Sequence, residues 1–246
     1  GGGQGPAPGA IPTQLIDGPV VNQSADGRAA KGRWYGFFLT TDGKGSAAIE
    51  GGMLENDYVL QNGAWKIRSL HFTPQFKGAY ETGWTNWKGG NLPIIPYHFN
   101  ADERGIAIPP PAGPAPKTTA TLADLERRIA VMNEETHVRN LQAAYGHYVN
   151  RRMWDDVVDL FARDGVYEVN GRLHTGAAGV RAALERMGPA GLTQGVLNDR
   201  LQFDTLVTIA PGGREAFARG IELGLLGEAS KNEAHWEVNV FRNRFV

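Results

Sequence analysis

The chain has 246 residues with no cysteine, 41% hydrophobic and 21% charged residues, and a formal net charge of −1. These values are ordinary for a globular protein and suit one large or two modest domains. Disulfides and thiolate chemistry are excluded. The balanced charge offers no basic field for nucleic acid, and no apolar run reaches the ~20 residues of a membrane helix. We therefore expect no nucleic-acid or membrane partner, while a cytoplasmic or a periplasmic location stays open.

The first part of the chain consists of strand and turn patterns. Residues 1–12 are rich in glycine and proline and lack the features of an intact signal peptide, so we expect a flexible leader. Residues 13–84 then predict a curled antiparallel sheet, because strand patterns alternate with short turns. The clearest signals are a hairpin turn at 25–28, strands at 31–40, 52–61 and 65–72, and the two-residue turn Asn62-Gly63.

A proline-dense connector follows at residues 85–118, where regular structure is unfavourable and a stiff, extended linker is expected. A helix is predicted to begin near Thr121. Its first apolar residues follow the narrow spacing of a coiled coil: Leu122, Leu125, Ile129 and Met132. This seam is too short for a lasting coiled coil, so it predicts a segment that packs on a neighbour.

The stretch 139–168 predicts a long helix, a tight break, a short helix and a strand. Apolar residues of each helix fall on one face: Leu141, Tyr145 and Tyr148 on the first, and Trp154, Val157, Val158 and Phe161 on the second. Asp164-Gly165 is a turn signal that precedes the strand. Thr175 is expected to cap a third helix, and strands resume from Thr193 to the end.

The pattern Tyr-x-x-Tyr-Val, then Met-Trp-Asp-Asp-Val-x-x-Leu-Phe-x-x-Asp-Gly, runs from Tyr145 to Gly165 and is followed by a strand, Gly171-Arg172, Gly176 and a short helix. This pattern resembles the nuclear transport factor 2-like superfamily, in its SnoaL-like branch, and the resemblance covers most of the chain. It implies a cone-shaped, cystatin-like α+β fold, in which a curved mixed or antiparallel sheet and three helices enclose a pocket. Because one fold hosts many chemistries, function must be argued from the site.

The last strands repeat the first ones. Three pairs of segments match, at offsets of 180, 186 and 182 residues: Thr13-Gln14 with Thr193-Gln194, Val20-Val21 with Leu206-Val207, and Leu54-Glu55 with Trp236-Glu237. We interpret this as a diverged tandem duplication. Residues 13–84 would be the sheet half of a first SnoaL-like unit, and residues 119–246 a second unit without its last strand.

Two arrangements fit such a partial duplication. The chain is either a segment of a longer tandem protein, or its first sheet and its later helices form one composite cone. Both arrangements leave an open sheet edge, which is a liability unless it is paired. We therefore expect a homodimer, pairing with another sheet-bearing chain, or pairing between the two sheets of this chain.

The resemblance places Tyr145 where ketosteroid isomerases, which look similar here, keep an oxyanion-stabilising tyrosine, and Tyr148 is the neighbouring candidate. A buried phenol can donate one strong hydrogen bond to developing charge, although each ring could equally be a core tyrosine with a satisfied hydroxyl. The general base of those isomerases falls on Val169, which cannot take a proton. The histidine of dehydratase-like members is replaced by Gly195, so neither shared mechanism is supported.

Proton transfer must then use other side chains. His174 and Glu237 are the candidate proton carriers, beside the alternatives of a packing histidine and of a solvent-facing strand. Four residues are candidates for substrate binding: Trp154, Asn198, His235 and Asn239. His235, Glu237 and Asn239 alternate along one strand, so they share a face.

The sequence contains no metal-ligand spacing, phosphate loop, dinucleotide fingerprint or Gly-x-Ser-x-Gly elbow, so no metal or cofactor is expected. We expect a cofactor-free lyase, dehydratase or isomerase that moves protons on a hydrophobic, cyclic or aromatic small molecule. The alternative is a non-catalytic module for small-molecule binding or oligomerisation.

Overall fold

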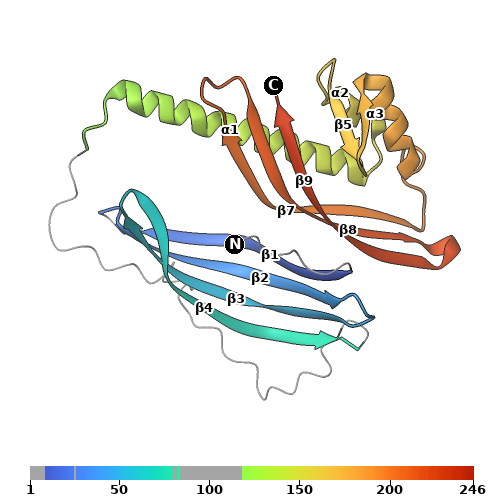
Figure 1. The fold of residues 1–246 in the computed structure, drawn as a ribbon, viewed down its shortest axis with the longest axis horizontal. Helices are drawn as coiled ribbons and strands as arrows, with labels where there is room; N and C mark the ends of the chain where they lie inside the picture. Colours follow the sequence, from blue (N-terminus) through green and yellow to red (C-terminus); the bar gives the residue numbers. More distant parts are fainter. Residues whose placement is uncertain (1–8, 25, 80–81, 84–117) are drawn as a thin grey trace. The chain divides into compact units, whose positions relative to one another are not determined.

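The computed structural model describes residues 9–24, 26–79, 82–83 and 118–246 and divides the chain into two compact units, Gly1–Thr119 and Ala120–Val246 (Figure 1). The predicted leader up to residue 8 and the predicted connector up to residue 117 lie outside the described residues. All strand pairings in the described parts are antiparallel. The α+β class predicted from the sequence is confirmed.

The first unit is a four-stranded meander. Its strands follow one another in the order of the chain: β1 (Ala10–Gln23), β2 (Ala29–Asp42), β3 (Ala47–Gln61) and β4 (Ala64–Ala79). Ala10 pairs with Asp42, so the leader expected over 1–12 is wrong at its end, where the backbone already belongs to the sheet. The predicted turn at Asn62-Gly63 is confirmed, since both residues have positive φ, 51° and 75°.

The strands of this sheet are longer than predicted, and two glycines of β3 make room for aromatic rings of β4. Gly51 lies in β3, where a Cβ atom would come within 2.2 Å of the Phe76 ring of β4. Gly52 lies beside the ring of Phe72 in the same way. Glycine at these two positions therefore lets two aromatic rings lie flat across the strand.

The second unit combines helices with strands. Its elements are α1 (Leu122–Asn150), α2 (Trp154–Asp159), β5 (Val166–Val169), β6 (Arg172–Thr175), α3 (Gly176–Leu184), η2 (Glu185–Met187), β7 (Val196–Ile209), β8 (Ala216–Glu228), η3 (Ala229–Lys231) and β9 (Glu233–Phe245). This order of helices and strands is the one predicted from residues 139–168 and the sequence that follows them. In the described residues β5 and β6 form a hairpin of their own, and β7, β8 and β9 form a three-stranded sheet.

The helical core of this unit gathers around the start of α2. Trp154, Val157, Val180 and Leu184 are almost completely buried, and Val149 of α1 closes the cluster. The indole Nε1 of Trp154 donates to the Gly188 carbonyl oxygen at 3.0 Å. The two apolar helix faces predicted from the spacing therefore meet in one core.

The contact between α1 and the sheet is made by polar side chains. Gln142 Nε2 donates to Gln202 Oε1 at 3.1 Å, and Asn243 Nδ2 donates to Gln142 Oε1. Asn198 Nδ2 donates to the Val149 carbonyl oxygen at 3.0 Å, near the carboxyl end of α1. Gly146 lies between these contacts, where a Cβ atom would come within 3.1 Å of the Gln202 amide. Glycine thus allows the helix to approach β7 closely enough for the amides to pair.

The strands of the two units share a register that fits the duplication. β1 has a bulge between Asp17 and Val20, and β7 has one between Phe203 and Leu206. The two bulges lie 186 residues apart, which is the offset of the second sequence match. The third match is out of register. In the first unit Ala30 pairs with Tyr58, and in the second unit its counterpart Ala216 pairs with Phe245. Tyr58 therefore corresponds to Phe245, and counting back along the two strands makes Glu50, not Glu55, the counterpart of Glu237.

Asn198 provides a direct test of the docking of α1. The substitution Asn198→Ala removes the donor for carbonyl groups that the helix leaves unsatisfied at its carboxyl end. We expect it to lower the free energy of unfolding by about 1–3 kcal/mol, measured by urea denaturation. Arg242→Ala, at an exposed position of the same sheet, is the control and should change stability by less than about 0.5 kcal/mol. Equal effects of the two substitutions would contradict the docking role.

Candidate functional site

Five polar side chains gather on the face of the β7–β8–β9 sheet that looks toward α1. Residues paired across antiparallel strands share a face. Gln202, which contacts α1, pairs with Glu222, and Glu222 pairs with Asn239. In the adjacent rows, Arg200 and Glu237 both pair with Gly224, and His235 pairs with Leu226. We call this group the Arg200 cluster: Arg200, Glu222, His235, Glu237 and Asn239.

Arg200 connects the two carboxylates of the cluster. Its Nη1 atom lies 3.1 Å from Glu222 Oε1 and 2.9 Å from Glu237 Oε2, and the Arg200 and Glu222 side chains are only 13% and 15% exposed. His235 Nε2 lies 3.5 Å from Glu237 Oε1. Among the described residues, the buried Nε of Arg200 has no hydrogen-bond partner. The guanidinium therefore holds both carboxylates through Nη1, while its buried Nε–H is not used by either of them.

Charge pairing sets the protonation state of the cluster. Burial alone would raise the pKa of Glu237, but the hydrogen bond and the charge of Arg200, with a smaller contribution from His235, outweigh burial and lower that pKa. Burial would lower the pKa of Arg200, and the two glutamates raise it instead. At neutral pH Glu237 is a carboxylate that Arg200 fixes in place, so it is a weak base.

Tyr145 lies where α1 meets both the helical core and the sheet. Its ring packs on the core cluster, and Tyr167 of β5 lies close enough to affect its hydroxyl. Burial raises the pKa of the Tyr145 phenol well above its usual value, and Tyr167 and the charge of Glu222 raise it further, while Arg200 acts in the opposite direction. The phenol therefore stays protonated and remains a donor at neutral pH.

The other predicted site residues fall into two groups. His174 pairs with Tyr167 across the β5–β6 hairpin and so shares its face, and its buried Nε2 has no partner among the described residues. Tyr148 packs on the same core as Tyr145. Trp154 is 1% exposed and Asn198 is 3% exposed with its amide nitrogen bound to α1. These last two were predicted to bind substrate, but burial and hydrogen bonding give them a structural role.

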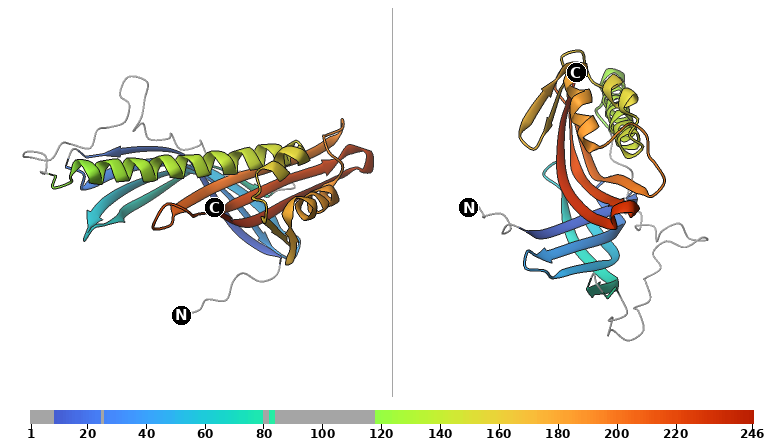
Figure 2. Two further views of the ribbon diagram at one scale, coloured as in Figure 1. Left: turned by 90° about the horizontal axis from the view of Figure 1, so that it is seen from above. Right: turned by 90° about the vertical axis from the view of Figure 1, so that its right-hand side faces the viewer.

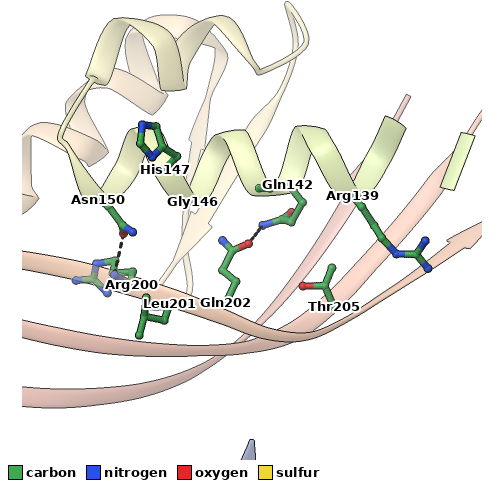
Figure 3. A pocket seen from close by; sticks show the side chains of 10 residues that line it. Arg139, Gln142, Gly146, His147, Asn150, Arg200, Leu201, Gln202 and Thr205 are labelled. Carbon is green, nitrogen blue, oxygen red and sulfur yellow. Dashed lines mark hydrogen bonds between the residues drawn. The ribbon is translucent and has the colours of Figure 1, made fainter. Parts of the chain in front are cut away.

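A groove of about 420 Å³ runs between α1 and β7 (Figure 3). Arg200 and Asn150 lie at one end, where Asn150 Oδ1 accepts from the Arg200 backbone N–H at 2.8 Å. Gln142 and Gln202 lie in the middle, and Arg139 lies near the other end. None of the predicted site residues lines this groove, and Arg200 is the residue that it shares with the cluster.

Sequence reasoning missed Arg200, Glu222 and Tyr167. A signal did exist for Glu222, which is the acidic residue in the middle of the apolar run Gly220–Leu226. The groove had a signal too, because Arg139, Gln142, Gly146 and Asn150 recur at helical spacing and form a polar or small stripe on α1. The described residues contain no group of three or more histidine, aspartate or glutamate side chains placed to hold a metal. No helix in the described ranges is long and apolar enough to span a bilayer.

The lowered pKa of Glu237 makes a prediction about pH. A carboxyl group whose pKa is depressed by folding contributes stability above its ordinary value of about 4.5, and that stability is lost as the pH falls through the lower, folded value. The difference in unfolding free energy between wild type and Glu237→Gln should therefore be largest above this value and shrink below it. We expect no more than about 1 kcal/mol, since the pair is partly exposed.

Urea titrations over a series of pH values measure this difference. Glu233→Gln, at an exposed position of the same strand, is the matched control and should show a smaller pH dependence. A difference between wild type and Glu237→Gln that grows as the pH falls would contradict the Arg200 pairing.

One family model and several solved structures are similar to this chain. The family model described as the SnoaL-like domain matches residues 7–71 and 130–246. No curated protein matches the chain. A solved NTF2-like protein with a cystatin-like fold from Novosphingobium aromaticivorans has 22% sequence identity and a TM-score of 0.42, covering 52% of this chain and 81% of that chain. A protein of Xanthomonas campestris pv. campestris, described as a "putative polyketide cyclase", has 21% identity and a TM-score of 0.31, covering 45% of this chain and 79% of that chain.

The family match spans most of the chain in two segments, one on the first sheet and one on the second unit. The shared strand register adds that these segments are diverged, partial copies of one unit. The chain belongs to the SnoaL-like domain family.

Proposed function

We propose that the second unit is a cofactor-free enzyme that moves a proton on a hydrophobic, cyclic or aromatic small molecule, as a lyase, dehydratase or isomerase does. The observation that carries this proposal is the position of Tyr145, a phenol held protonated within electrostatic reach of Glu222 and Arg200. A donor beside a group of fixed charges is the arrangement that stabilises negative charge as it develops on a substrate oxygen.

In this proposal Tyr145 polarises the substrate carbonyl. Its raised pKa means that the phenol does not lose its proton at neutral pH, so it can donate to the oxygen throughout the reaction. Tyr167 lies close to Tyr145, and its ring packs edge-to-face against Phe161 with the ring centroids 6.1 Å apart. These rings supply an apolar, aromatic surface next to the donor, which suits a cyclic or aromatic ligand.

In this proposal His235, which the sequence suggested for substrate binding, becomes the proton carrier. Its Nε2 faces Glu237, so Nδ1 is the nitrogen that can exchange a proton with a ligand. Arg200 fixes Glu237, and Glu237 in turn orients the imidazole, as carboxylates commonly do for catalytic histidines. Glu237, which we considered as a proton carrier, is too weak a base and takes the orienting role. His174, which pairs with Tyr167 across the β5–β6 hairpin, remains the second candidate.

The proton that this mechanism removes from the substrate is also returned to it. His235 takes a proton from the carbon next to the carbonyl, which leaves an enolate whose oxygen Tyr145 stabilises. The same proton returns to a different carbon in an isomerisation, or to a departing hydroxyl group in a dehydration. No electron leaves the substrate, so no oxidant or reductant takes part.

Exchange of hydrogen for deuterium tests the proposal without knowledge of the natural substrate. Cyclohexenone and α-tetralone are incubated with the protein in deuterium oxide, and loss of the proton signal next to the carbonyl is followed by NMR. We expect exchange faster than in buffer, reduced by roughly 100-fold in His235→Ala and in Tyr145→Phe. His137→Ala and Tyr35→Phe, at exposed positions, are the controls and should keep the wild-type rate.

The outcome separates two functions. Exchange that survives both site substitutions would exclude these residues as the catalytic pair. Saturable binding of either ketone with no exchange above buffer would favour a non-catalytic binding module, because the internal ion pairs of Arg200 would then serve the fold alone.

A further inference from the structure

The carboxyl-terminal half of α1 lies along β7 (Figures 1 and 2), and the groove between them is lined mainly by hydrogen-bond donors. Its lining contains two arginines and a histidine but no aspartate or glutamate. The other polar groups are the hydroxyl of Thr205 and three carboxamides, from Gln142, Asn150 and Gln202. A carboxamide can donate or accept, so its orientation decides which ligand groups the groove can hold.

The fold uses the oxygens of these carboxamides and leaves two of their amide nitrogens over. Asn150 Oδ1 accepts from the Arg200 backbone N–H at 2.8 Å, and Gln202 Oε1 accepts from Gln142 Nε2 at 3.1 Å. Gln142 Oε1 accepts from Asn243 Nδ2. Within the part of the chain that the structure describes, Asn150 Nδ2 and Gln202 Nε2 have no hydrogen-bond partner. The amide groups therefore offer N–H donors to an oxygen atom of a ligand.

Arg139 adds a positive charge near one end of the groove (Figure 3). It is paired with Glu135, one helical turn earlier, at 3.6 Å, and the two side chains are 47% and 32% exposed. An exposed pair of this kind contributes little, so a carboxylate of a ligand can compete for the guanidinium. Arg200 near the other end differs, because Glu222 and Glu237 already balance its charge. An anionic group is therefore favoured at the Arg139 end.

We propose that this groove binds a small organic acid that carries a second, neutral oxygen. Arg139 holds the carboxylate, since a guanidinium presents its N–H groups in the geometry that a carboxylate accepts. The Gln202 amide donates to a carbonyl or hydroxyl oxygen farther along the ligand. That amide lies against Gly146, where a Cβ atom would come within 3.1 Å of Nε2, so a larger residue on α1 would displace the donor.

The remaining lining suits the body of such a ligand. Ala143 and Leu201 are apolar and can contact a hydrocarbon spacer between the two oxygen groups. The volume of about 420 Å³ lies in the range of small-molecule sites. Neither Tyr145 nor His235 lines the groove, so this binding is separate from the proton transfer proposed above.

Three related compounds test the two ends of the site separately. Levulinate carries a carboxylate and a ketone, methyl levulinate lacks the charge, and valerate lacks the ketone. Each is titrated into the isotope-labelled full chain, and the side-chain amide signals of Gln202 are followed by NMR. We expect saturable shifts with levulinate, roughly tenfold weaker binding of the ester and several-fold weaker binding of valerate. Absence of saturation with levulinate, or equal affinities for the three compounds, would overturn the proposal.

Two substitutions on α1 should change levulinate affinity in opposite directions. Arg139→Gln removes the cation and should weaken binding roughly tenfold, whereas Glu135→Gln removes the competing carboxylate and should strengthen it. Arg128→Gln makes the same change of charge at an exposed position of α1 outside the groove and should bind as wild type does. Circular dichroism verifies that each variant is folded. Wild-type affinity in Arg139→Gln, or weaker binding in Glu135→Gln, would contradict the assignment of the carboxylate.

Discussion

The docking of α1 on β7 through side-chain amides is the constraint on which the second unit depends. Gly146 brings the helix close to the strand, Gln142 pairs with Gln202, and Asn198 satisfies carbonyl groups at the carboxyl end of the helix. Buried amides are costly unless they are paired, so a network of this kind accepts one register of helix on strand. That register brings Tyr145 to the Arg200 cluster and leaves the groove beside it.

The candidate site combines a neutral group with charged ones. Tyr145 is held in its neutral form, while Arg200 holds Glu237 in its charged form. Arg200 belongs to the groove and to the cluster, so it joins the docking surface to the proposed chemistry. Membership in the SnoaL-like family agrees with a pocket between helices and sheet, and the residues of this chain decide what that pocket can do.

Local signals in the sequence were sufficient for the elements. The start of a helix near Thr121, the apolar faces around Trp154 and the turn at Asn62-Gly63 each depend on a few neighbouring residues, and the structure has them as predicted. Thr175 lies at the predicted cap of α3, although its side chain makes no capping hydrogen bond.

The site could be predicted only in part, because it depends on which strand residues lie opposite one another. Glu237 was found from its alternation with His235, whereas Glu222 and Arg200 come from two other strands and meet it only through the register. Trp154 and Asn198 were predicted to bind substrate but are buried. The sequence alone does not distinguish an indole or an amide in a core from one that lines a pocket. The third repeat match was wrong by five residues. The two strands contain similar residues at positions that do not correspond in the strand pairing, which aligns Glu50 with Glu237.

A double-mutant cycle between Gln142 and Gln202 tests the docking constraint most directly. The free energies of unfolding of Gln142→Ala, Gln202→Ala and the double variant are compared with that of wild type. A docking hydrogen bond predicts a coupling energy of about 0.5–1.5 kcal/mol between the two positions. Additive effects within about 0.3 kcal/mol would show that α1 is held by other contacts, and the position of Tyr145 would then lack its physical cause.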